Sequence, residues 1–202
     1  MGQAIAEVLP AAVAMVLVSP LPVVAVIVLL LSPKAALAPA FVAGWLLGLV
    51  VAFGILLFIV PLDDIVGTER TPSAVASIVR ILLGLALLVM AVRKWRDRPK
   101  PGSESAPPTW MASLERASPL AALGLAALLS GANPKTLVFI VATAIAVAQP
   151  HLAPGERLVS LVVFVLLASV GVVAPALWML VARDRASVSL AGWKTWLTAN
   201  YA

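Results

Sequence analysis

A single lysine interrupts one of the most apolar stretches of this sequence. Lys135 follows Asn133 and Pro134 within residues 120–148, a run with no other charged side chain. A charge at the middle of a membrane helix costs at least ~2.5 kcal/mol, so it indicates a partner or a function. Pro134 breaks the helix, and the Asn133 amide adds two donors and an acceptor. The combination predicts a site for an anion, a zwitterionic head group or a sugar phosphate. The alternative is a lysine that pairs with backbone carbonyls and binds nothing.

The first apolar stretch of the chain carries a similar break. Ser19, Pro20 and Pro22 interrupt it near its middle, and Ser130 precedes the later break. We predict that the two breaks share one substrate site, to which both serines contribute hydrogen bonds. Prolines also kink buried membrane helices without binding anything, and this is the alternative for each break.

Three further charged residues lie in or beside apolar stretches. Arg80 is about a turn and a half inside its stretch, so it either reaches the outer head groups or lines the substrate cavity as an anion contact. Asp63 and Asp64 follow the second stretch directly. They are expected to be solvated end residues, and a role in gating or proton coupling is the alternative.

The sequence lacks the residues that several kinds of chemistry require. Cysteine is absent and His151 is the one histidine, which excludes thiolate chemistry and a histidine metal cluster. The serines at the breaks have no evident base, so no catalytic set is recognisable. The interiors of the apolar stretches contain no Asp or Glu, and hard cations need such ligands. We expect no cofactor, no resident metal and no enzyme activity.

Long apolar stretches must position these residues. Hydrophobic side chains make up 62% of the chain and charged ones 11%, whereas a soluble domain has about a quarter charged. A helix needs about 20 mostly apolar residues to cross a bilayer, and five stretches reach that length. They are residues 5–31, 35–60, 74–92, 120–148 and 158–182. The sequence predicts an all-α integral membrane protein whose first stretch is a retained span and not a signal peptide.

The basic residues predict how these spans are oriented. The net charge of +5 does not indicate nucleic-acid binding, because most basic residues flank apolar stretches. Ten of the fourteen fall on one side of the membrane: Lys34, six within residues 93–116, and Arg183, Arg185 and Lys194. The positive-inside rule then places the N-terminus outside and the polar linker, residues 94–118, in the cytoplasm. Residues 186–202 carry Trp193, Trp196 and Tyr201 and are expected to lie at the interface, leading to a sixth span that this sequence does not contain.

The two interrupted spans also suggest an internal repeat. The first and fourth spans run in opposite directions and are broken at similar depth, which is typical of inverted-repeat transporters with a site at the bilayer midplane. We predict a first three-helix half over residues 1–93 and a second half over residues 119–202, joined by the linker. Within the second span, Ala40, Gly44 and Gly48 form a small-residue series that allows close helix packing, inside one chain or in a dimer.

Short motifs spread along the chain resemble a known family. They are Ser19-Pro20-Leu21-Pro22, Ser32-Pro33-Lys34, Phe41-Val42-Ala43-Gly44-Trp45, Leu128-Leu129-Ser130, Asn133-Pro134-Lys135, Lys194-Thr195-Trp196-Leu197 and Asn200. In this order they resemble the GAP or Sap (sulfolipid-addressing protein) family of the lysine-exporter superfamily, from about Ala14 onward. The resemblance implies a six-helix, often dimeric exporter of the bacterial inner membrane, linked to delivery of glycolipids to the cell envelope. This chain departs from it by ending at Ala202, where family members continue into a final helix.

Residues and resemblance together predict an exporter of a lipid, a glycolipid or another small solute with a polar head group. One alternative is an accessory subunit that does not transport and that binds anionic lipid or an envelope-export partner through basic residues 93–100. Another is an exporter of small amino acids, which other branches of the superfamily contain. A membrane-embedded enzyme would need catalytic groups gathered at one depth.

Overall fold

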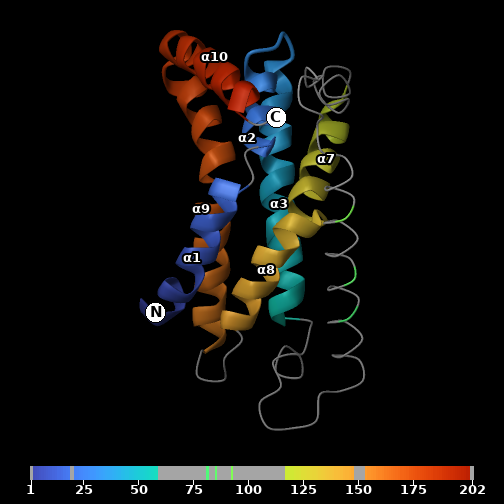
Figure 1. Ribbon diagram of the computed structural model, residues 1–202, viewed down its shortest axis with the longest axis vertical. Helices are drawn as coiled ribbons and strands as arrows, with labels where there is room; N and C mark the ends of the chain where they lie inside the picture. The colour runs from blue at the N-terminus through green and yellow to red at the C-terminus, as the bar shows by residue number, and fades with distance from the viewer. Residues whose placement is uncertain are drawn as a thin grey trace.

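The computed structural model describes residues 2–18, 21–58, 117–147 and 153–200, with residues 81, 85 and 92. Every regular element within the four ranges is helical (Figure 1). The elements are α1 (Gly2–Val18), α2 (Leu21–Leu30), the short 3-10 helix η1 (Ala35–Leu37), α3 (Ala38–Phe58), α7 (Pro119–Gly131), α8 (Pro134–Val147), α9 (Pro154–Val181) and α10 (Arg183–Asn200). The predicted all-α class is confirmed.

The long helices coincide with predicted membrane spans. Ala35–Phe58 and Gly155–Val181 are each long and apolar enough to cross a bilayer unbroken. Two helix pairs are also apolar enough when each pair is taken together, and each is a broken span or a re-entrant loop: Ile5–Val16 with Leu21–Leu30, bent by 63°, and Pro119–Gly131 with Pro134–Val147, bent by 55°. The described residues therefore hold up to four of the five predicted spans, with both predicted breaks. The third, residues 74–92, lies outside them except at residues 81, 85 and 92.

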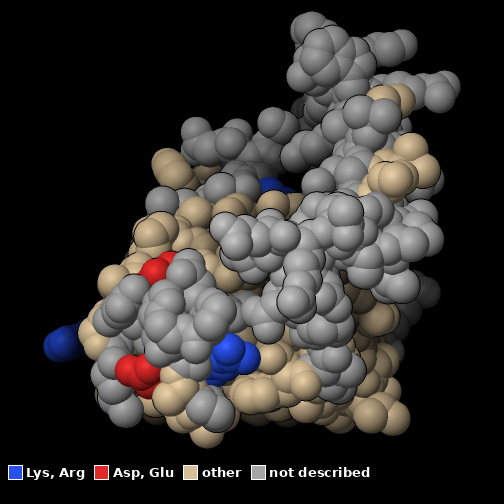
Figure 2. Space-filling view, turned by 90° about the horizontal axis from the view of Figure 1, so that it is seen from below, with Lys and Arg blue, Asp and Glu red and all other residues tan. Residues whose placement is uncertain are grey.

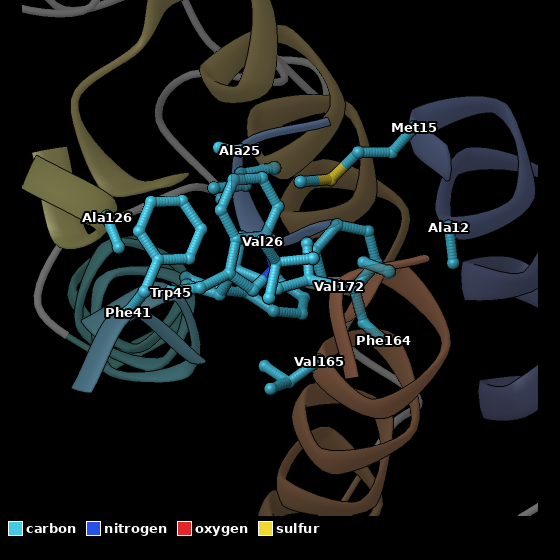
Figure 3. Close-up of a cluster of buried hydrophobic side chains, with 14 of the residues drawn as sticks. Ala12, Met15, Ala25, Val26, Phe41, Trp45, Ala126, Phe164, Val165 and Val172 are labelled. Atoms are coloured by element: carbon cyan, nitrogen blue, oxygen red, sulfur yellow. The ribbon is translucent and has the colours of Figure 1, made fainter. Parts of the chain in front are cut away.

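The unbroken helices α3 and α9 run antiparallel through the bundle, and the broken helices pack on them (Figure 1). α7 lies mainly along α3, whereas α1 lies mainly along α9, and α8 contacts both α1 and α3. Aromatic side chains from α3 and α9 fill the space between these helices (Figure 3). The rings of Phe53 and Phe164 meet edge to face with centroids 5.0 Å apart.

Glycines bring α3 and α7 into backbone contact. A Cβ atom on Gly44 would collide with the backbone of Leu123, and one on Gly48 would collide with Ser130 Oγ and the Ala127 backbone. From the other side, a Cβ on Gly131 would lie 2.7 Å from the Gly48 carbonyl oxygen. The predicted packing role of the small-residue series is confirmed for Gly44 and Gly48, within one chain.

The segment after α9 is a helix and not only an interfacial lead-in. The backbone leaves α-helical geometry at Ala182, with φ −140° and ψ 57°, and α10 then packs on α9 and α2. Ala186 and Leu190, four residues apart, are fully buried, and the rings of Trp178 and Trp193 lie 5.7 Å apart. A single apolar stripe is therefore enough to hold this polar helix across the end of the bundle.

The two ends of the bundle differ in the loops they carry. The turn after α2, which holds Lys34, and the junction of α9 and α10, which holds Arg183 and Arg185, lie at one end (Figure 1). The starts of α1 and α9 lie at the other end, where Figure 2 shows both acidic and basic side chains on the described surface. Lys34, Arg183 and Arg185 therefore lie at one end of the bundle, and the side of the membrane that this end faces stays a prediction.

Candidate functional site

The break between α7 and α8 is a defined local structure. The last α-helical hydrogen bond of α7 runs from the Ala132 N–H to the Leu128 carbonyl at 3.0 Å. The next helix begins at Pro134, whose ring removes a donor and cannot continue the preceding helix. Residues 132 and 133 therefore join two half-helices within one apolar stretch.

Asn133 starts the second half-helix. Its side-chain Oδ1 accepts a hydrogen bond from the Lys135 backbone N–H at 3.0 Å, and its carbonyl accepts from the Leu137 N–H at 2.9 Å. Asn at the N-cap followed by Pro at N1 is a favoured start for a helix. The side-chain oxygen is thus committed to capping, and the amide N–H groups are the part of Asn133 suited to a ligand.

Two buried hydroxyl groups form hydrogen bonds next to the break between α7 and α8. Ser130 is fully buried and donates to the Ala127 carbonyl at 3.2 Å. Thr136 is 2% exposed and donates across the break to the Leu129 carbonyl at 3.4 Å. The Ser130 hydroxyl also lies against Gly48 of α3, and its predicted role in binding substrate stays a prediction. Thr136 was not singled out from the sequence. The sequence feature that could have identified it is a hydroxyl residue in the first helical turn after a helix-breaking proline.

Lys135 lies in the first turn of α8 and is half-buried, as are Asn133 and Pro134. The first turn of a helix carries backbone N–H groups without intrahelical partners and a partial positive charge. The lysine charge adds to that field. The residues from Asn133 to Lys135 therefore form a cationic end, inside an apolar stretch, of the kind that favours anionic groups.

The remaining predicted site residues are only partly described. Pro22 is buried in the first turn of α2, directly after the first break. Both breaks lie along the middle part of the bundle's length (Figure 1). The structure does not describe the other predicted site residues, which are Ser19, Pro20, Asp63, Asp64 and Arg80. The one histidine, His151, also lies outside the described residues.

Two buried polar atoms mark positions that sequence reasoning missed. Trp45 Nε1 in α3 and Ser169 Oγ in α9 have no hydrogen-bond partner in the described structure, although the residues are 2% and 1% exposed. A buried polar group without a partner costs about 1–3 kcal/mol, which makes these atoms candidate ligand contacts. The sequence feature that could have identified these two positions is a polar group near the middle of each unbroken apolar helix.

Comparison with protein families gives a match that covers most of the chain. A family model described as Sap, sulfolipid-1-addressing protein, matches residues 8–202. No curated protein and no solved structure matches significantly. The matched range includes the break and both unbroken helices, and the resemblance seen in the short motifs is confirmed.

Proposed function

We propose, from the premise that this chain belongs to the Sap, sulfolipid-1-addressing protein family, that it exports a lipid with an anionic head group across the bacterial inner membrane. The family description names the addressing of a sulfolipid and no enzyme activity. A sulfolipid combines apolar chains with an acidic head group. The cargo proposed for this chain has the same two parts.

One observation carries the proposal: the cationic start of α8 within an otherwise apolar span. A head group crossing the bilayer must leave water for roughly 30 Å of hydrocarbon, where an unpaired charge is very costly. The start of α8 offers an ammonium group, the positive end of the helix dipole and the Asn133 amide N–H groups at the break. These groups would replace water around the head group while the acyl chains remain in lipid.

The packing of the helices supports a mechanism in which two halves move. The halves are residues 1–93 and 119–202, joined by the cytoplasmic linker 94–118. Each broken helix packs mainly on the unbroken helix of the other half, α7 on α3 and α1 on α9. Such reciprocal packing is expected for inverted repeats, in which rocking of one half against the other opens a central site alternately to each side.

Delivery of the lipid in cells tests the proposal. Replacing Lys135 by Gln removes the positive charge and keeps a polar side chain, whereas Lys135→Arg keeps the charge. A charged hydrogen bond is worth about 1.5–3 kcal/mol, so Lys135→Gln is expected to lower delivery by about tenfold or more. Lipid analysis of the outer envelope gives the readout, and Lys135→Arg is expected to retain most of the delivery.

The same experiment distinguishes an accessory role. A parallel variant replaces the arginines and lysines of residues 93–100 with Gln. If Lys135→Gln delivers lipid as the wild type does while the loop variant does not, the exporter proposal is wrong and the chain acts as a docking subunit. Immunoblots of membrane fractions establish that all variants accumulate equally.

A further inference from the structure

A cavity lies away from the break, at the end of the bundle where α2 turns into α3 and α9 meets α10. Its volume is about 820 Å³, near the upper end of the ~300–1,000 Å³ typical of small-molecule sites. One wall comes from α3, with Val42 and Leu46, and the opposite wall from α9, with Val173 and Leu177. The cavity is therefore apolar along the bundle and bounded by two spans.

The outer rim of this cavity faces the region that lipid occupies. Leu177 and Leu180, both at the cavity, are 55% and 80% exposed. Both belong to α9, which is long and apolar enough to span the membrane. Exposed leucines on such a helix are suited to acyl chains, so the cavity is open to a chain from the surrounding leaflet.

One end of the cavity is polar and the surrounding charge is positive. Arg183, Asp184, Ser32 and Ser187 lie there. A guanidinium group can bind phosphate or sulfate through two parallel hydrogen bonds, and carboxylate and hydroxyl groups suit the hydroxyls of a head group. Lys34 and Arg185 are exposed in the same two segments, so the charges of residues 31–34 and 183–187 sum to +2 (three basic, one acidic).

We propose that this cavity binds a lipid with an acidic head group, holding the phosphate or sulfate at Arg183 and one acyl chain between α3 and α9. The inference rests on the proposed function, because it makes the cavity the place where the cargo leaves the leaflet beside the basic loops.

Lipid binding to the purified full chain tests the inference. The probes are phosphatidylglycerol, phosphatidylcholine and free inorganic sulfate, and binding is measured by native mass spectrometry from detergent. The wild type should bind phosphatidylglycerol more tightly than phosphatidylcholine and should bind sulfate only weakly. Arg183→Gln should lower the affinity for phosphatidylglycerol about tenfold and leave phosphatidylcholine nearly unchanged.

Two further variants keep the result interpretable. Arg185→Gln removes a neighbouring exposed charge that does not line the cavity and should leave binding unchanged. Ala176→Trp fills the apolar wall and should weaken both lipids. If Arg183→Gln and Arg185→Gln lose the same amount of phosphatidylglycerol affinity, the effect is one of general surface charge and the inference is wrong. Equal affinity of the wild type for both lipids, or unchanged lipid binding in Ala176→Trp, would also overturn it. Circular dichroism establishes that each variant is folded.

The experiments distinguish failure of the cavity proposal from failure of the proposed export function. Lys135→Gln should bind phosphatidylglycerol at this cavity as the wild type does, because Lys135 does not line it. If export depends on Lys135 while Arg183→Gln binds normally, the exporter stands and the cavity proposal fails. If Arg183→Gln loses binding while Lys135→Gln exports normally, the cavity binds lipid and the proposed export site is wrong.

Discussion

At Gly48 the backbone of α3 touches α7 next to the break. The hydrogen of this glycine is all that fits between α3 and the side chain of Ser130, and Gly131 is equally constrained from the other helix. A helix that ends at Gly131 against such a fixed neighbour has its C-terminal end held in place. The geometry of the proposed site at Asn133 and Lys135 therefore depends on the contact between Gly48 and Gly131.

A side chain at Gly48 should destabilise the protein without changing the chemistry of the site. Gly48→Ala forces α3 and α7 apart, and overpacking of this kind costs about 1–3 kcal/mol. We expect the midpoint of thermal unfolding in detergent to fall by several degrees. Gly124→Ala is the matched control, because its added Cβ would meet nothing within 4 Å. The control should be as stable as the wild type or about 1 kcal/mol more stable, since Ala favours helix. Equal midpoints for the two variants would contradict the packing described here.

At the residue scale, charge in an apolar run was the most informative signal. Lys135 and Pro134 were recognisable because each is costly inside a membrane helix. The partners of the hydroxyls were not predictable, because they depend on the bend: Thr136 reaches Leu129, seven residues away, only across it. The orphaned Trp45 and Ser169 atoms also need three-dimensional packing to be recognised.

At the element scale, the break is produced by few residues. α7 and α8 would form one continuous apolar helix without Pro134 and the Asn133 cap, and instead their axes differ by 55°. The new helix start is what places the ammonium group of Lys135 at the positive end of the α8 dipole. Geometry and charge therefore depend on the same short segment.

Replacing Pro134 should straighten this span. Pro134→Ala restores an N–H donor and removes the ring clash with the preceding turn, so the helix can continue. Spin labels at Leu120→Cys and Ala142→Cys, both exposed positions in a chain without cysteine, report the change by pulsed electron paramagnetic resonance. The distance should increase by roughly 3 Å, given the 1.5 Å rise per residue. Pro119→Ala, at the start of α7, should leave the distance unchanged. An unchanged distance in Pro134→Ala would mean that packing, and not proline, makes the bend.

Element bounds were largely predictable because hydropathy and proline fix where membrane helices end. α9 begins at Pro154, a few residues before the predicted 158, because the Glu156 carboxylate accepts from the Ala153 N–H at 3.2 Å and caps the helix. α10 was expected only as an interfacial segment. Its helix is held by buried Ala186 and Leu190, a stripe too short to stand out in a polar sequence.

At the scale of the whole molecule, neighbours were harder to predict than elements. Hydropathy gives the lengths of spans, but it does not specify that α7 packs on α3 and α1 on α9. Only the glycines of α3 indicated a close partner. The cavity at Arg183 was not predicted at all, because its walls come from segments more than a hundred residues apart in the chain, Val42 and Leu46 on one side and Val173 and Leu177 on the other.

Lipid translocation by the purified protein tests the central claim most directly. The full chain is reconstituted in vesicles containing a trace of a fluorescent acidic lipid, and a membrane-impermeant quencher reports how fast that lipid changes leaflet. The account predicts faster exchange than in protein-free vesicles, about tenfold or more slower exchange with Lys135→Gln, and largely restored exchange with Lys135→Arg. Exchange no faster than in protein-free vesicles, or equal rates for the wild type and Lys135→Gln, would contradict it.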